Sequence, residues 1–228
     1  MSGENKYGSL DRAGVLRALT QTAELLSGAE SPTEEVFVVG GAWMALHGLR
    51  DSTTDVDSLT TLSPAVVAAA SEVGDLHGLN PKWFNASSRG FRPNLELDRT
   101  LCTVGFDHPS LRVWLPHADY VFVMKLEAGR AVDDADLRKL WPLTTFTDAD
   151  AALELFHEAY PLSQNYDEHL GSWLAKLVAR AEATGPPADD QAARDYLGSH
   201  PPSIEPKDGA ASQRPPAEPP TQRDKAPK

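Results

Sequence analysis

Cysteine is nearly absent: Cys102 is the single cysteine in 228 residues, so no intramolecular disulfide can form. Because Leu101, Thr103 and Val104 flank it, we expect Cys102 to be a small buried residue on a strand. The sequence contains no run of about 18 apolar residues that could span a bilayer, and its first residues lack the apolar stretch of a secretory signal. It therefore predicts a cytoplasmic protein with no membrane partner.

Positive charge is also scarce, with 21 Lys and Arg residues against 33 Asp and Glu residues and a net charge of −12. Nonspecific binding of nucleic acid requires basic side chains that neutralise phosphates. This composition therefore disfavours a protein that binds nucleic acid nonspecifically over a broad surface. A local basic patch is still allowed in the central part of the chain. Its candidate members are Lys82, Arg89, Arg92, Arg99, Arg112, Lys125 and Arg130.

Apolar residues become rare near the end of the chain, and ten of the 18 prolines follow residue 185. Such a segment buries too little apolar surface to offset the entropy of ordering it, so we predict a disordered Pro-rich tail at 186–228. The remaining chain is long enough for one domain with a sizeable core. We expect an N-terminal helix within 1–30, a core at 31–142, and C-terminal helices packed on that core at 143–185.

The first half of the chain alternates helix and strand patterns. Apolar residues recur at helical spacing after Ser9, a residue that commonly caps helices, and Gly28 offers a stop. Residues 35–39 are short, apolar and β-branched, which is typical of a buried strand. A short helix should follow at 42–49, a strand at 55–62, and a further helix after Ser63 and Pro64.

The second half of the chain is mainly helical. Residues 80–100 predict loops around the aromatic anchors Trp83 and Phe84, and 101–106 with 111–115 predict an antiparallel hairpin. Helical periodicity covers 118–130 and 134–141, and two more helices should begin at the caps Thr147 and Asp167. The fold class predicted from these elements is α/β (α+β): a small mixed sheet, flanking helices and a helical C-terminal half.

Two aspartates at the start of the second strand are the most informative residues. Successive side chains of a strand point to opposite faces, so Asp55 and Asp57 should project together while Val56 turns into the core. Paired carboxylates repel unless a cation or proton lies between them, and Mg²⁺ is commonly held by one or two carboxylates plus substrate phosphates. An isolated Asp-Val-Asp is nevertheless more often a solvated strand face or a turn cap.

A glycine pair, Gly40 and Gly41, ends the first strand. Without side chains these residues allow a triphosphate to approach the backbone, and the N-terminus of the following helix offers unpaired N–H groups. A glycine pair after a strand is more often a plain tight turn. The conjunction of the glycine pair with Asp55 and Asp57 is therefore what predicts a site.

The order of these parts resembles the DNA-polymerase-beta-like nucleotidyltransferase superfamily: a strand, a glycine pair, a short helix, a turn with Arg50 and Thr54, and then Asp-x-Asp. Residues 81–85, 111–130 and 133–137 resemble its bacterial minimal nucleotidyltransferase and abortive-infection branch, which is type IV toxin-like. The resemblance implies an NTP substrate and a Mg²⁺ cofactor held by Asp55 and Asp57. It also implies catalytic and nucleotide-binding residues, which are Gly40, Gly41, Arg50, Thr54, Lys125, Arg130, Asp133 and Asp136.

Within that set, the resemblance implies that Lys125 contacts nucleotide phosphates and that Asp133 or Asp136 completes the site. The sequence departs from the superfamily pattern at one point. A third metal carboxylate commonly lies on a later strand, whereas 102–106 and 111–115 contain no acid, and Asp107 at the strand end is a poor substitute. Asn85 and Trp83 could also face the cleft, although a tryptophan under a loop is more often an anchor.

The function implied by the resemblance is transfer of an NMP from an NTP to a hydroxyl acceptor. In this branch the acceptor is RNA, typically tRNA, the protein acts as a toxin, and a cognate antitoxin protein would be its partner. Two alternatives stay open. One is a catalytically weakened binding or regulatory module, suggested by the missing strand carboxylate. The other is a small-molecule nucleotidyltransferase of the antibiotic-modifying kind, with which the acidic net charge is compatible.

Overall fold

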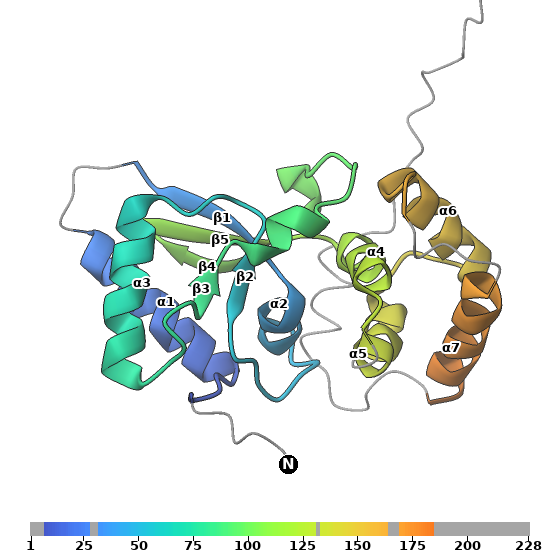
Figure 1. Ribbon diagram of the computed structural model, residues 1–228, viewed down its shortest axis with the longest axis horizontal. Coiled ribbons are helices and arrows are strands. Elements are labelled where there is room, and N and C mark those ends of the chain that lie inside the picture. The colour runs from blue at the N-terminus through green and yellow to red at the C-terminus, as the bar shows by residue number, and fades with distance from the viewer. Residues whose placement is uncertain (1–6, 28–31, 131–132, 164–168, 185–228) are drawn as a thin grey trace, which may run out of the picture.

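The computed structural model describes residues 7–27, 32–130, 133–163 and 169–184. Within these ranges the chain forms seven α-helices and a five-stranded mixed sheet, which confirms the predicted mixed α/β class. The sheet and the first three helices form one part of the molecule, and α4 to α7 form the other (Figure 1). The predicted tail at 186–228 and the predicted cap Asp167 lie outside the described residues.

The sheet has the strand order β3-β2-β1-β5-β4. Its central strand β1 (Glu34–Val39) pairs antiparallel with β2 (Val56–Ser58) and parallel with β5 (Leu111–Leu115). The strand β3 (Phe84–Asn85) extends the sheet beyond β2, and β4 (Thr103–His108) pairs antiparallel with β5. The predicted hairpin is confirmed, and the first two strands of the chain are neighbours in the sheet.

The strand β2 is shorter than the predicted strand at 55–62, because the chain turns after Ser58. The Ser58 hydroxyl donates to the Thr60 carbonyl at 3.0 Å and accepts from the Thr60 N–H at 2.9 Å. These bonds close a tight turn, and the N–H of Leu59 donates to the carbonyl of Phe37 at 2.8 Å. A side chain that bonds to nearby backbone competes with the strand ladder, which is why the ladder ends here.

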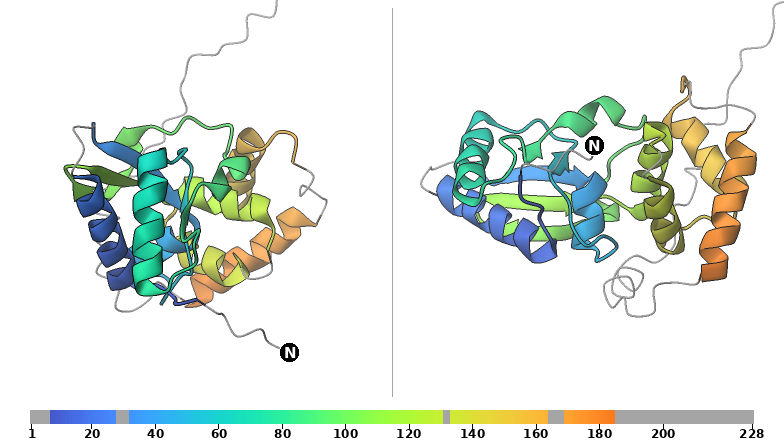
Figure 2. Two further views of the ribbon diagram at one scale, coloured as in Figure 1. Left: turned by 60° about the vertical axis from the view of Figure 1, so that its left-hand side comes forward. Right: turned by 60° about the horizontal axis from the view of Figure 1, so that its bottom comes forward.

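Three helices accompany the strands: α1 (Arg12–Leu26), α2 (Gly40–Leu46) and α3 (Pro64–His77). The helices α1 and α3 pack side by side (Figures 1 and 2). The predicted cap at Ser63 is confirmed, since its hydroxyl accepts from the N–H of Val66. The predicted cap at Ser9 is wrong. Asp11 caps α1, because Leu10 pairs with Thr53 and keeps the chain extended past Ser9.

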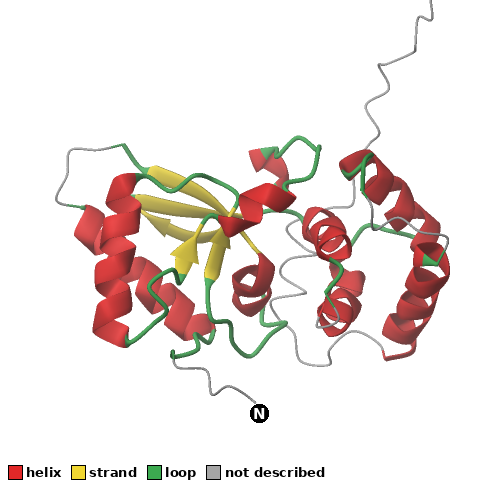
Figure 3. Cartoon of the chain, in the orientation of Figure 1, coloured by secondary structure: helices red, strands yellow, loops and turns green. Residues whose placement is uncertain are grey.

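The helical part contains α4 (Ala118–Ala128), α5 (Asp133–Leu140), α6 (Ala149–Ala159) and α7 (Leu170–Thr184). The helices α4 and α5 lie between the sheet and the outer pair α6 and α7 (Figures 1 and 3). The predicted cap at Thr147 is wrong, because the carboxylate of its neighbour Asp148 accepts from the N–H of Ala151 and caps α6. Short 3₁₀ helices complete the described elements: η1 (Ser87–Phe91), η2 (Arg99–Leu101) and η3 (Trp141–Leu143).

One continuous hydrophobic core joins both parts of the molecule, and its largest fully buried side chains include Trp43, Trp83, Phe122 and Phe156. Trp83 is the anchor predicted for the loop region, because its indole N–H donates to the carbonyl of Ala70 at 2.7 Å. No helix in the described part of the chain is long and apolar enough to cross a membrane.

The prediction that Cys102 is a buried strand residue is wrong. Cys102 is half-buried and follows η2, one residue before β4 begins. Its thiol donates to the carbonyl of Asp98. Burial, and secondly the charge of Asp98, raises the pKa of the Cys102 thiol to about 12, so the thiol stays protonated at neutral pH.

Candidate active site

A pocket of about 480 Å³ opens where β1, β2 and α4 meet. It is lined by nine of the ten residues proposed from the sequence, which come from four separate segments of the chain. These nine residues are Gly40, Gly41, Arg50, Thr54, Asp55, Asp57, Lys125, Arg130 and Asp133. The tenth, Asp136, does not line the pocket, but its carboxylate binds Lys125.

The two aspartates of β2 lie on the pocket side of the strand. Asp55 and Asp57 both line the pocket, while Val56 between them is fully buried in the core. The alternation expected for a strand is therefore confirmed at these three positions. Asp57 lies opposite Val39 of β1 and Asn85 of β3, so the strand that carries it is paired on both sides and is not an edge strand.

The Asp57 carboxyl has an unusual proton affinity. Burial of the group, and secondly the negative charge of Asp55, raises the pKa of Asp57 from 3.8 to about 6. A hydrogen bond from Asn85 and the positive charge of Arg130 act in the opposite direction but do not cancel the rise. Two carboxylates that share a partly desolvated site disfavour a second negative charge, and a bound cation would relieve this repulsion.

The glycine pair forms the first turn of α2 rather than a separate turn before it, which corrects the expected start of the helix at residue 42. Gly40 has φ +68°, and a Cβ added there would lie 3.3 Å from an Asp57 carboxylate oxygen. A Cβ added to Gly41 would lie 2.5 Å from the Thr53 hydroxyl oxygen and 2.9 Å from an Arg50 guanidinium nitrogen. The pair therefore allows β2 and the preceding loop to approach the start of α2 closely.

The loop at 49–55 is held from the opposite side by the N-terminal segment. Leu10 and Thr53 exchange two backbone hydrogen bonds of 2.7 and 2.8 Å. The buried Thr53 hydroxyl donates to the Asp55 carbonyl at 3.0 Å. The backbone at Asp55 is thus fixed before any ligand is present.

Lys125 of α4 is buried between two carboxylates of α5. Its ammonium nitrogen lies 2.8 Å from Asp133 and 2.8 Å from Asp136. All three side chains are at least nine-tenths buried. The side chain that the family resemblance assigns to nucleotide phosphates therefore has two protein partners, although it also lines the pocket.

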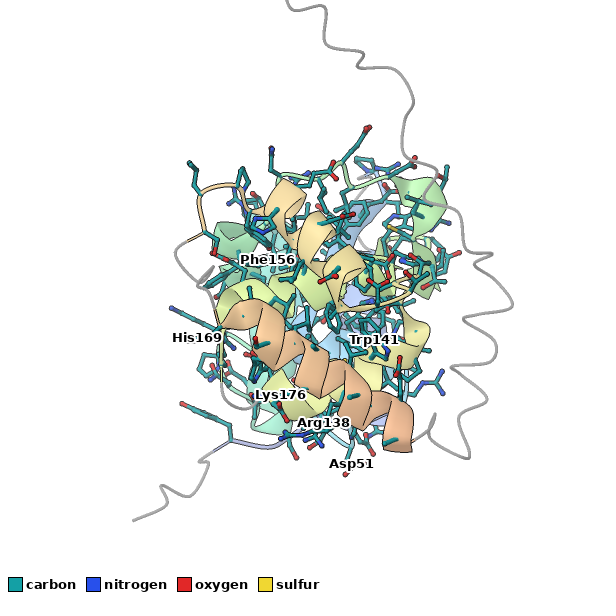
Figure 4. All side chains as sticks on the ribbon, turned by 90° about the vertical axis from the view of Figure 1, so that its right-hand side faces the viewer. Asp51, Arg138, Trp141, Phe156, His169 and Lys176 are labelled. Carbon is teal, nitrogen blue, oxygen red and sulfur yellow. The ribbon has the colours of Figure 1, made fainter. Side chains whose placement is uncertain are left out.

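The same helix α5 reaches the loop that precedes the aspartates. Asp136 lies 3.8 Å from an Arg50 guanidinium nitrogen, and the Lys139 ammonium donates to the Leu49 carbonyl at 2.8 Å. Figure 4 shows Asp51 of this loop at the same edge of the molecule as Arg138 of α5. Asp136 therefore links Lys125 to Arg50, and α5 supports the loop that carries the pocket residues from 50 to 55.

The basic residues of the central stretch do not form one patch. Lys125 is paired in the interior, Arg99 pairs with Glu35 at 2.5 Å, and Arg112 pairs with Asp107 at 2.8 Å. Asp107, the acid near the end of β4, therefore has Arg112 as its partner. Lys82, Arg89, Arg92 and Arg130 are exposed, and Arg99 is also exposed although it pairs with Glu35.

One comparison with known proteins gives a match. The model of the family described as nucleotidyltransferase of unknown function (DUF6036) matches residues 14–170, which is more than half of the chain. The chain belongs to this family. The matched range of this nucleotidyltransferase-family chain contains every predicted site residue, from Gly40 to Asp136. No curated protein and no solved structure shows significant similarity to the chain.

The oxygen ligands on the pocket wall suit magnesium. Asp55 and Asp57 supply carboxylates, and both line the pocket together with the glycine pair. Mg²⁺ prefers oxygen ligands and usually keeps several waters, with one or two protein carboxylates and substrate phosphates completing the octahedron. Among the described residues, no group of three His, Cys, Asp or Glu side chains is placed to hold a metal ion. The site thus fits a metal that binds together with its substrate.

Nine further residues that line the pocket were not predicted as site residues, among them Thr53, Ser88 and Phe91. Thr53 adjoins the predicted Thr54, and no local signal distinguishes the two threonines. Ser88 and Phe91 belong to η1, a region whose pattern predicted only loops. Asn85, which the sequence suggested could face the cleft, lies beside Asp57 on the neighbouring strand.

Proposed function

We propose that the protein is a Mg²⁺-dependent nucleotidyltransferase that moves an NMP from an NTP to a hydroxyl acceptor. The observation that carries the proposal is the pocket, in which Asp55 and Asp57 face the Gly40–Gly41 turn in a chain of a nucleotidyltransferase family. In the transfer, the acceptor oxygen bonds to the α-phosphorus, the bond from that phosphorus to the bridging oxygen breaks, and pyrophosphate leaves. The protein's contribution is to position the reactants and to stabilise charge.

Each group of pocket residues has a separate role in positioning the reactants and stabilising charge. Asp55 and Asp57 would hold the magnesium, whose positive charge would stabilise the phosphate oxygens. Gly40 and Gly41 let Asp57 and the loop with Arg50 pack close to the start of α2, and the outer phosphates would lie beside this turn. Arg50, Thr54 and Arg130 line the same pocket and offer donors to the phosphates. Lys125 has two of its three N–H groups directed at Asp133 and Asp136, so it has one left for the nucleotide.

For the acceptor we propose RNA, with tRNA as the first candidate, and for the biological role a toxin restrained by a cognate antitoxin protein. Two observations support an RNA acceptor. The sequence resembles the abortive-infection branch, and the exposed cations Lys82, Arg89, Arg92 and Arg130 lie in segments that border the pocket. Phosphate-rich ligands bind where such cations gather.

A second candidate function is a binding or regulatory module without turnover. It is favoured by the buried pairing of Lys125 and by the absence of a third metal carboxylate in the described part of the chain. Such a module would keep the nucleotide pocket and bind Mg·NTP, but would release no pyrophosphate. Binding alone therefore cannot separate the two candidates.

The deciding experiment incubates the full chain with each α-labelled NTP, Mg²⁺ and either total tRNA or a small cationic acceptor such as an aminoglycoside, and measures both labelled acceptor and released pyrophosphate. The enzyme predicts label in RNA that EDTA abolishes and that Asp55→Asn lowers by orders of magnitude. Asp51→Asn is the matched control, because Asp51 is exposed in the same loop and does not line the pocket. Binding of Mg·NTP without label or pyrophosphate favours the regulatory module, and label on a small cationic acceptor instead of RNA favours an antibiotic-type enzyme.

A further inference from the structure

The pocket has two chemically different sides. The glycine pair and the segment from Arg50 to Asp57 form a polar side, whereas the side formed by α4 and η1 carries four apolar residues, Val121, Met124, Ala128 and Phe91, next to Lys125 and Ser88. A nucleoside triphosphate has the same division, since phosphates occupy one end and a flat base the other. The apolar side is where a base would bind if the phosphates were at the glycine pair.

Phe91 stands out on the apolar side because its side chain is 42% exposed although it lines a pocket. An aromatic ring that leaves much of its surface in water gains free energy when a second flat ring covers it. The neighbouring apolar residues Val121 and Met124 are buried, so they form the floor and leave Phe91 at the rim.

The backbone that carries Phe91 is fixed from the end of α6. The Tyr160 hydroxyl donates to the Phe91 carbonyl at 2.5 Å, and the Asn94 N–H donates to the Ala159 carbonyl at 2.8 Å. Burial, and secondly Tyr120 and then Glu127, raises the pKa of Tyr160, so its hydroxyl stays protonated and able to donate. The helix η1 also packs against α4 and β2, which places the ring beside the pocket in a defined position.

The segment around η1 has a charge suited to an anionic ligand. From residue 76 to residue 95 it contains no Asp or Glu, in a chain whose net charge is −12. Lys82, Arg89 and Arg92 lie in this segment, and all three are exposed. A cationic segment with an exposed aromatic ring is the combination that binds a nucleotide through stacking and phosphate attraction.

We propose that Phe91 is the surface on which the base of the bound NTP stacks, and that Tyr160 is the positioning residue that holds it there. The proposal rests on the proposed function, because it assumes that the phosphates lie at the glycine pair. Stacking of a base on an aromatic side chain corresponds to a factor of about 5 to about 140 in affinity. Every base has a flat face, so all four NTPs should bind, and purines should gain more because their rings are larger.

The test compares two ligands that differ by the nucleoside. Titration calorimetry measures Mg²⁺-ATP and Mg²⁺-tripolyphosphate binding to the full chain, and the ratio of the two affinities isolates the contribution of the nucleoside. The wild-type protein should prefer ATP, and Phe91→Ala should reduce this preference by about 5-fold to 140-fold while leaving tripolyphosphate binding unchanged. Phe91→Trp should retain the preference, and Mg²⁺-UTP should lose less than Mg²⁺-ATP on Phe91→Ala.

Two further variants separate stacking from general disturbance of the fold. Tyr160→Phe removes the hydroxyl that holds the Phe91 carbonyl, so its preference for ATP should fall between those of the wild type and Phe91→Ala. Leu101→Ala removes a similarly exposed apolar side chain outside the pocket and should behave as the wild type. An unchanged ATP preference in Phe91→Ala, or an equal loss of both ligands, overturns the stacking assignment alone. If the wild type binds neither ligand, the proposed function fails and the assignment fails with it.

Discussion

Replacing Asp57 with asparagine should make the metal-free protein more stable at neutral pH. In the folded state burial and Asp55 raise the pKa of Asp57 to about 6, whereas in the unfolded chain it is close to 3.8. The folded state therefore binds this proton more tightly. The stability that the group contributes is present below pH 3.8 and is lost as the pH rises through about 6. Asparagine keeps the shape of the side chain and carries no charge at any of these pH values.

The size of the effect follows from the two pKa values. At about 1.4 kcal/mol for each tenfold change in proton affinity, the raised pKa of Asp57 costs about 3 kcal/mol of folding free energy at pH 7.5, where the group is ionised in both states. At pH 4.5 the cost is about 1 kcal/mol, because the folded state keeps a proton that the unfolded chain has largely lost. Asp57 is only partly buried, so these values are upper limits. The Asp57→Asn variant should thus gain about 1 to 3 kcal/mol at pH 7.5 and less at pH 4.5.

Urea denaturation, followed by tryptophan fluorescence at both pH values in EDTA, measures the gain. Repeating it with Mg²⁺ and NTP tests the metal site, because a ligand that binds only the folded state stabilises it by RT ln(1 + [L]/Kd). Wild-type protein should gain stability from the ligands, and Asp57→Asn should gain much less. Asp51→Asn removes an exposed charge from the neighbouring loop and serves as the control.

Two results would refute this reasoning. If Asp57→Asn is no more stable than the wild type at pH 7.5, the carboxylate does not carry the electrostatic cost that its burial implies. If Mg²⁺ and NTP stabilise the variant as much as the wild type, Asp57 is not a metal ligand.

Two further substitutions test the supports of the site. Gly41→Ala places a Cβ 2.5 Å from the Thr53 hydroxyl, so the loop must shift. Calorimetry should show Mg·NTP affinity reduced at least about tenfold, and urea denaturation should show a free energy of unfolding lower by about 1 to 3 kcal/mol. The control Gly90→Ala adds a Cβ that meets open space and should be neutral. Lys125→Met leaves two buried carboxylates without their cation, so thermal and urea denaturation should show a loss of about 3 to 5 kcal/mol. A Lys125→Met protein as stable as the wild type would show that the buried pairs contribute nothing.

Local spacing was sufficient to predict the face shared by Asp55 and Asp57. The period of two in a strand applies to any three consecutive residues, so Val56 could be assigned to the core without knowledge of the neighbouring strands. The same holds for the buried strand at Val36 and Val38, and for the cap at Ser63, where the signal lies within a few residues of the feature. These local structural features were therefore predicted correctly.

Lys125 shows what local spacing cannot predict. Its partners Asp133 and Asp136 lie eight and eleven residues later, on a different helix, because α4 ends at Gly129 in the left-handed conformation and α5 begins at Asp133. The helical periodicity of 118–130 and of 134–141 predicts two helices but not how they are oriented relative to each other. The contact depends on how the two helices pack, which is a tertiary property.

Phe91 and Thr53 were missed for a related reason. Phe91 lies in a region with irregular spacing, and its place at the pocket depends on Tyr160, which is 69 residues away in the sequence. Thr53 and Thr54 are equivalent in a local pattern. Only the pairing of Thr53 with Leu10 directs its side chain toward Asp55. Both residues owe their position to long-range hydrogen bonds that leave no local signal.

Two electrostatically costly groups of the described structure lie at the pocket. Asp57 carries a carboxylate into a partly buried site, and Lys125 faces two buried carboxylates. Unfavourable local features persist where function requires them and the surrounding structure holds them. A cation bound with phosphates would relieve the repulsion between Asp55 and Asp57, so the proposed ligand accounts for a cost at Asp57 that stability alone does not explain.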